Sequence, residues 1–260
     1  MNKLLHNNGY GIRADDEYFV NTPKLEMPAQ ESDKVVTLNN QGFMRVELDN
    51  FSRLWIKYAS ENKLPCLEIG AAYGQASIAA LELGGTIIAN DISPEHLIIL
   101  RNRVDSSLHK RLFLNNSSFP EELELLNNSI GHVLFCRLGH FFTNETLIRC
   151  FNIIYECLAL KGRLFYVGIS PYHYTLRDRF LPIFLKRKVN NEKNSGYIDN
   201  MREYIPRSFD KIPMFMNCFD EDTFTNLIKE TNFIIKEITL FDYRRNNSNG
   251  KGFLGVELIK

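Results

Sequence analysis

The sequence has no excess charge of either sign. Its 260 residues include 31 lysines and arginines and 31 aspartates and glutamates, and its pI is close to 7.0. A neutral chain has no overall field to attract nucleic acid or an anionic membrane, so either partner would need a local charged patch. The composition therefore disfavours nucleic acid as a partner.

Cysteines are few, and long apolar runs are absent. The five cysteines form no C-x-x-C pair, and their odd number argues against both a zinc site and a disulfide framework. No stretch approaches the roughly 18 apolar residues of a membrane-spanning helix, and the opening MNKLLHNNGYG is too polar for a secretory signal. We therefore expect a cytoplasmic protein with no metal and no membrane span.

A regular alternation of apolar segments is present instead. Residues 1–45 are polar and asparagine-rich and stay unassigned as an N-terminal arm, and residues 46–62 have the apolar spacing of a helix. Strands are then predicted at 64–69, 86–90, 111–115, 132–137 and 163–169, with helices at 74–83, 94–104, 120–127 and 144–159 between them. Strands separated by helices indicate right-handed crossovers and a parallel sheet.

The last part of the chain has a different pattern. A helix is predicted over 220–231, and strands at 233–241 and 252–259 are joined by a polar, glycine-containing loop, which is typical of a β-hairpin. The predicted fold is thus a three-layer, doubly wound, Rossmann-like α/β fold, with a mostly parallel seven-stranded sheet and a C-terminal antiparallel hairpin. Residues 46–169 would form its core, and 218–260 would complete it.

The turn after the first predicted strand has the pattern of a ligand-binding loop. In CLEIGAAYGQAS, residues 66–77, Gly70 and Gly74 bracket a turn at the carboxyl end of a parallel strand, where such sheets bind ligands. The helix that starts near Gly74 directs free N–H groups at that point, which favours an anionic group. Asp91 ends the second strand about twenty residues later, where an acid commonly binds ribose hydroxyls. These features predict a ligand with a ribose and an anionic group.

Two stretches together resemble the class I S-adenosylmethionine-dependent methyltransferases, namely LEIGAAYGQAS and IIANDISPEHL. The resemblance covers roughly residues 64–170 and returns at the C-terminal helix and hairpin. It implies S-adenosyl-L-methionine as cofactor and methyl transfer as activity. The implied cofactor residues are Glu68, Gly70, Ala72 and Gly74 in the loop, Asp91 at the ribose, Ile92 under the adenine, and Asn116 and Ser117 beside the adenine amine. Ala72 departs from the family's glycine, and Asn116 from its acid.

Glu68 is unusual because it lies inside an apolar strand. A buried carboxylate without a partner is costly. It must therefore reach either a polar group of the protein or the amino group of the cofactor, and we favour the cofactor.

Residues 170–217 form a long segment between the fifth strand and the last helix, and we interpret it as a substrate lid. It is rich in aromatic residues and has nine basic residues against five acidic ones. This composition favours an anionic or aromatic acceptor. Its run FLPIFLKRK could instead rest on a membrane surface or on a partner protein.

Candidate catalytic groups follow the fourth strand and begin the proposed lid. The resemblance places the stretch FCRLGHFF opposite the transferred methyl group, which makes His140 the first candidate for a general base, with His173 and Tyr172 after it. Imidazole has an ordinary pKa of about 6.5, so it can accept a proton near neutral pH. An N/D-P-P-Y motif is absent, which disfavours nucleobase and glutamine amines but leaves oxygen, nitrogen and carbon acceptors open.

Two other functions compete with catalysis of methyl transfer. Ala72 and Asn116 would suit an inactive methyltransferase-like domain that only binds or interacts. An NAD-linked reductase is a weaker alternative, because GAAYG lacks the middle glycine of the G-x-G-x-x-G fingerprint.

Overall fold

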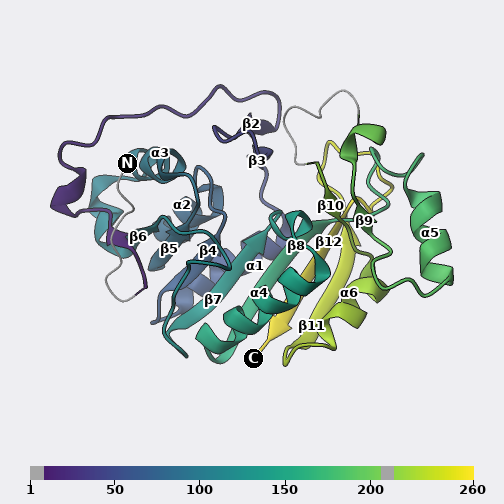
Figure 1. The fold of residues 1–260 in the computed structure, drawn as a ribbon. Coiled ribbons are helices and arrows are strands. Elements are labelled where there is room, and N and C mark those ends of the chain that lie inside the picture. The colour runs from purple at the N-terminus through teal and green to yellow at the C-terminus, as the bar shows by residue number, and fades with distance from the viewer. Residues whose placement is uncertain (1–8, 206–213) are drawn as a thin grey trace.

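A computed structural model describes residues 9–205 and 214–260, and its centre is one twisted eight-stranded sheet (Figure 1). The strand order is β1-β6-β5-β4-β7-β8-β12-β11. The bounds of these strands are β1 Ile12–Arg13, β4 Cys66–Ile69, β5 Ile87–Asn90, β6 Leu112–Asn115, β7 Ile130–Cys136, β8 Leu158–Ile169, β11 Ile234–Phe241 and β12 Phe253–Ile259.

The middle of the sheet is parallel and its edges are antiparallel. Strands β6, β5, β4, β7 and β8 run parallel, whereas β12 pairs antiparallel with both β8 and β11. The chain winds from β4 outward to β6 and then returns to β7 on the other side of β4, so the order reverses there. The predicted Rossmann-like fold with a terminal hairpin is confirmed. An additional edge strand, β1, comes from the unassigned arm and pairs with β6.

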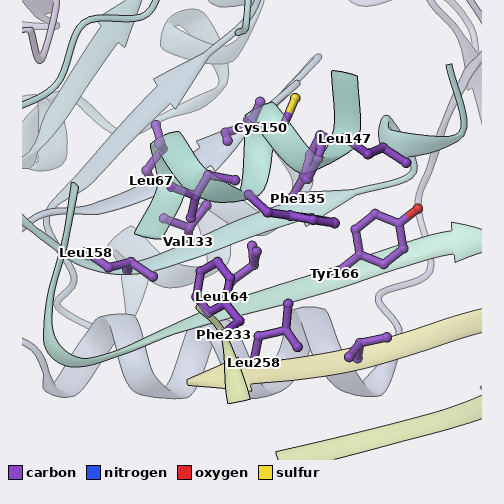
Figure 2. Packing of buried hydrophobic residues seen from close by; sticks show 14 of the residues in the cluster. Leu67, Val133, Phe135, Leu147, Cys150, Leu158, Leu164, Tyr166, Phe233 and Leu258 are labelled. Atoms are coloured by element: carbon purple, nitrogen blue, oxygen red, sulfur yellow. The ribbon is translucent and has the colours of Figure 1, made fainter. Parts of the chain in front are cut away.

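Helices cover both faces of the sheet. Helices α1 (Asn50–Glu61), α2 (Gln75–Glu82) and α3 (Pro94–Arg103) pack in one apolar cluster, and α4 (Asn144–Cys157) and α6 (Glu221–Ile228) in another. Because alternate strand residues point to opposite faces, Val133 and Phe135 of β7 join the second cluster while Leu134 joins the first. Figure 2 shows this second cluster between α4 and the strands.

One predicted helix is wrong. Residues 120–122 form a turn and residues 123–126 are irregular, and the Leu123 N–H donates to the carbonyl of Ser118 without starting a helix. Phe119 and Leu123 are anchored in the core, but Leu126 is 62% exposed, so the segment has no continuous apolar face to hold a helix against the sheet.

The described part of the unassigned N-terminal arm begins beside the edge strand β6, with which its strand β1 pairs. After the short 3₁₀ helix η1 (Glu17–Phe19), it passes over α3 and forms a hairpin of β2 (Lys34–Val36) and β3 (Phe43–Arg45), as the purple segment of Figure 1 shows. Two side chains hold the hairpin. The Tyr73 hydroxyl donates to the carbonyl of Val36 (2.9 Å), and the N–H of Leu38 lies within hydrogen-bonding distance of both Tyr73 Oη (3.0 Å) and His96 Nε2 (3.1 Å).

The segment 170–217 has a small apolar core of its own. It contains α5 (Leu181–Val189), η4 (Met201–Glu203) and the pair β9 (Tyr197–Ile198) and β10 (Met216–Asn217), packed around buried Phe180 and Phe184. The remaining 3₁₀ helices are η2 (Ser106–Arg111) and η3 (Gly139–Phe141). Arg207, Phe209, Asp210 and Lys211, counted in the composition of the predicted lid, lie outside the described residues. None of the described helices is long and apolar enough to cross a membrane.

The glycine before α2 yields the first prediction. Gly74 has φ 78°, and a Cβ atom there would lie 2.3 Å from Leu100 Cγ. We expect Gly74→Ala to lower the free energy of unfolding by about 2–4 kcal/mol, through left-handed strain and overpacking. Gly84 is the matched control, because it has φ 108° but an open Cβ position. Gly84→Ala should cost only the strain, about 1–2 kcal/mol. Equal losses in urea unfolding would contradict the packing argument.

Candidate functional site

A cavity of about 540 Å³ opens at the carboxyl ends of β4, β5 and β7, where the strand order reverses. Such a switch point is the usual ligand site of open α/β sheets. The turn after β4, the loop after β7 and the hairpin of β2 and β3 line it, together with residues that follow β5 and β6.

The turn after β4 is held by the carboxylate of Asp91. Gly70 and Ala72 both have left-handed backbones, with φ 72° and 46°. The Ala72 N–H donates to Asp91 Oδ2 (2.8 Å), while Oδ1 accepts from the Ser93 N–H (2.9 Å) and faces His96 Nδ1 (3.0 Å). Asp91 is buried, lines the cavity, and ties the end of β5 to the glycine turn.

The sequence pattern did not reveal His96, which lines the cavity, or Tyr73, which bonds the turn to the arm. Because His96 Nε2 faces a backbone N–H of the arm, its proton belongs on Nδ1, where it is donated to Asp91. His96 lies in the first turn of the helix that follows Asp91, and that nearness is the one signal that could have identified it. Tyr73 lies inside the glycine turn itself, but its partner is 37 residues earlier in the chain.

Glu68 extends from β4 toward α2. Its Oε2 accepts from the backbone N–H of Ser77 (2.9 Å) and from the Ser77 hydroxyl. Burial raises the pKa of Glu68 to about 7, although the bonds from Ser77 oppose the rise. Glu68 thus has a protein partner and still lines the cavity.

The other predicted cofactor residues divide into two groups. Ile92 is 59% exposed and lines the cavity, as do Gly70 and Ala72. Gly74 does not line it, because it faces Leu100, and Asn116 and Ser117 do not line it either. The structure places Ser118 and Phe119 at the cavity instead.

Asn116 and Ser117 have structural contacts. The amide of Asn116 donates to the carbonyls of Asp91 (2.9 Å) and Ile92 (3.0 Å), and buried Ser117 contacts Asn90 and Asn115. Both residues therefore brace the loop that follows β5.

His140 lies in the cavity, in η3 after β7, as the sequence predicted. The expectation of an ordinary imidazole pKa is wrong, because burial and the nearby charge of Arg137 lower the pKa of His140 to about 3. Its Nδ1 is buried and has no hydrogen-bond partner among the described residues. His140 is therefore neutral at physiological pH and is a weak base.

The two catalytic candidates at the start of the proposed lid, His173 and Tyr172, lie at different pockets. His173 lines the cavity, and its Nδ1 lies 2.7 Å from Thr175 Oγ1. Burial and the charges of Arg45 and Lys34 lower its pKa to about 3. Tyr172 instead borders a separate surface pocket beside Lys188.

Most of the cover over the cavity comes from the N-terminal hairpin. Its lining residues are Lys34, Thr37, Asn39, Gln41, Gly42, Phe43, Met44 and Arg45. From residues 170–217 only His173, Phe215 and Met216 line the cavity in the described structure. Among the described residues no cluster of three or more His, Cys, Asp or Glu could hold a metal.

The buried neutral histidines predict a pH dependence of stability. Burial lowers the pKa of His132 to about 4, beside the values near 3 for His140 and His173. Unfolded histidines titrate near 6.5, so below that pH the unfolded state binds more protons and stability is lost as pH falls. Glu68, whose pKa is raised in the folded state, has the opposite effect and adds stability as the pH falls from about 7 to 4.5. The three histidines together outweigh this one carboxyl. We expect the free energy of unfolding to fall by about 2–3 kcal/mol between pH 6 and 5.

Urea unfolding at pH 7, 6 and 5 measures this dependence. His140→Gln removes one of the titrating groups and should reduce the slope by about 1.4 kcal/mol per pH unit. A slope that the substitution leaves unchanged would show that His140 titrates normally in the folded protein.

Comparison with known proteins identifies the fold. No family model and no curated protein matches the chain. Among solved structures, the chain is similar to an S-adenosylmethionine-dependent methyltransferase from Mesorhizobium loti, with 13% identity, TM-score 0.58, and 80% of this chain and 95% of the other covered. It is equally similar to one from Methanosarcina mazei, with 15% identity, TM-score 0.59, and coverage of 82% and 98%.

A third similar structure contains ligands. It is the 1,6-didemethyltoxoflavin-N1-methyltransferase of Burkholderia thailandensis with bound 1,6-didemethyltoxoflavin and S-adenosylhomocysteine, with 13% identity, TM-score 0.56, and coverage of 81% and 78%. At such low identities the likeness concerns the fold. The chain has the fold of the S-adenosylmethionine-dependent methyltransferases.

Proposed function

We propose that this protein is an S-adenosylmethionine-dependent methyltransferase acting on a small-molecule acceptor. The observation that carries the proposal is the convergence of the Gly70–Ala72 turn and the Asp91 carboxylate on one cavity at the switch point of the sheet. The fold shared with methyltransferases supports it. The similar Burkholderia thailandensis methyltransferase has a small molecule, 1,6-didemethyltoxoflavin, bound, which supports that class of acceptor.

The residues at the cavity fit the cofactor. Asp91 accepts one donor at Oδ2 and two at Oδ1, which leaves an acceptor site on Oδ2 for a ribose hydroxyl. Ile92 offers an exposed apolar surface for an adenine ring, and Ser118 and Phe119 lie where Asn116 was expected to contact it. Glu68 and the N–H groups at the start of α2 suit the amino and carboxylate groups of the cofactor.

S-adenosylmethionine supplies an electrophilic methyl group, so the work of the protein is mainly positioning and exclusion of water. The hairpin of β2 and β3 covers the cavity, and we propose that residues 170–217 close its other side over the acceptor. Phe141 and Phe142 contribute apolar lining beside His140. This apolar lining suits an aromatic acceptor.

The role of His140 follows from its neutrality. With a pKa of about 3, it can orient a hydroxyl or amine of the acceptor through a hydrogen bond, but it gives little driving force for removing a proton. We therefore propose proximity catalysis with His140, and secondarily His173, as orienting groups. Tyr172 borders a different pocket and is left without a role in the cavity. The five free thiols suit a reducing compartment such as the cytoplasm.

Calorimetric titration with S-adenosylhomocysteine, S-adenosylmethionine and NAD tests the proposal. We expect the first two ligands to bind and NAD not to bind. Asp91→Asn keeps an oxygen for the Ala72 N–H but removes the charge, and it should weaken S-adenosylhomocysteine binding by about 1–3 kcal/mol.

Asp105→Asn is the matched control, because Asp105 is an acid at the N-terminus of η2, outside the cavity. It should leave the affinity unchanged. A folded protein that shows no heat with S-adenosylhomocysteine at millimolar concentration would refute the cofactor assignment. Binding without methyl transfer to any acceptor would favour a non-catalytic binding module.

A further inference from the structure

We propose that Arg137 forms the centre of an anion-binding subsite in the acceptor half of the cavity, and that the acceptor is an apolar, preferably aromatic molecule with a carboxylate. This inference rests on the proposed function. It refines the acceptor class and assigns a residue that the sequence analysis had not selected.

The backbone fixes the position of Arg137. It follows β7 directly, has a left-handed conformation with φ 56°, and donates its N–H to the carbonyl of Val167 in β8 (2.7 Å). A non-glycine residue in this conformation is uncommon and strained, so the surrounding structure must hold it there. The side chain lines the cavity.

The guanidinium of Arg137 has unused donors. Its Nε and Nη1 atoms are buried and have no hydrogen-bond partner, and within residues 9–205 and 214–260 the side chain forms no ion pair and interacts with the sulfur of Cys136, a weak acceptor. A buried charged donor without a strong acceptor is costly. A ligand anion would satisfy these donors.

The carboxyls whose charges act on Arg137 are engaged elsewhere. Asp49 accepts from the N–H and hydroxyl of Ser52 (both 2.8 Å) and from the hydroxyl of Tyr243 (3.0 Å). Glu68 accepts from Ser77, as described above. Neither carboxyl forms an ion pair with Arg137.

Two further cations line the same part of the cavity. Arg45 lies over the rings of Tyr243 (4.4 Å) and Phe253 (5.4 Å), and its own charge is paired with Asp33. Burial and the charges of Arg45 and Arg137 lower the pKa of Lys34, as expected where cations gather. The hairpin thus places further positive charge near Arg137.

Arg137 could bind the carboxylate of either the proposed acceptor or the cofactor. The position of Arg137 in the sheet, relative to Asp91, decides between the two. Arg137 bonds to β8 and lies 5.7 Å from the ring of Tyr243, beside the start of β12, whereas Asp91 ends β5. Arg137 follows β7, which is two positions from β5 in the sheet, or roughly 10 Å at 4.8 Å per strand, and its guanidinium lies near Tyr243 on the side of β8 and β12. The N-terminus of α2 already offers donors to the cofactor carboxylate. We therefore assign Arg137 to the acceptor.

The lining around Arg137 defines the rest of the ligand. Leu138, Phe141, Phe142, Ile169 and Phe253 are apolar and line the cavity. Arginine binds carboxylates in a bidentate manner, which orients a planar acid and its ring together. An aromatic or otherwise apolar carboxylate matches both features.

Benzoate and its neutral analogue benzamide are suitable probes. Titrations use the full chain, with and without S-adenosylhomocysteine, and three variants: Arg137→Met, Arg137→Lys, and Arg149→Met as control. Arg149 pairs with Glu121 on the surface, outside the cavity. We expect the wild type to prefer benzoate by about tenfold or more, and Arg137→Met to abolish that preference. Arg137→Lys should retain part of it, and the control all of it.

A wild type that binds benzoate and benzamide equally would overturn the proposal, as would an Arg137→Met variant that keeps the preference. If Arg137→Met fails to fold, Arg137→Lys tests the proposal instead, because it should keep only part of the preference for benzoate over benzamide.

A parallel titration with 5′-methylthioadenosine, which lacks the amino-acid carboxylate, separates the two carboxylate sources. If Arg137→Met weakens S-adenosylhomocysteine but not methylthioadenosine, Arg137 holds the cofactor and the acceptor assignment is overturned. A selective benzoate response without S-adenosylhomocysteine binding would refute the cofactor assignment but support the anion subsite.

Discussion

The cavity depends on the carboxylate of Asp91. It accepts the N–H of Ala72 from the turn after β4 and the N–H of Ser93 from its own loop, and it faces the protonated nitrogen of His96. The bond to Ala72 stabilises a left-handed alanine that would otherwise strain the turn. One buried acid therefore shapes the loop, and it is the group that we propose to bind the ribose.

The same contacts connect the turn to the N-terminal hairpin. His96 bridges Asp91 and the backbone of Leu38, and Tyr73 bonds to the arm from within the turn. The hairpin is thus anchored on the side chains that order the proposed cofactor loop. Hydrogen bonds through His96 and Tyr73 therefore join the cover of the cavity to its floor.

Burial determines the protonation of the histidines in the part of the cavity that contains His140 and His173. Burial keeps His140 and His173 neutral, and the charge of Arg137 lowers the pKa of His140 further. A neutral histidine beside a buried arginine suits the orientation of the proposed anionic acceptor better than proton removal. The proposed methyl transfer would tolerate this, because positioning and desolvation can supply most of the effect.

Local patterns in the sequence determined the order of strands and helices, the terminal hairpin, and the meeting of Gly70 with Asp91, because carboxyl ends of neighbouring parallel strands share one edge. Tertiary structure decided the rest. The arm looked featureless because its hairpin is held by Tyr73 and His96, which are distant in sequence, and residues 120–127 lack an apolar face to fold as a helix. The neutrality of His140 and the unpaired guanidinium of Arg137 likewise arise from burial and from which charges the fold brings near, and no local pattern encodes either.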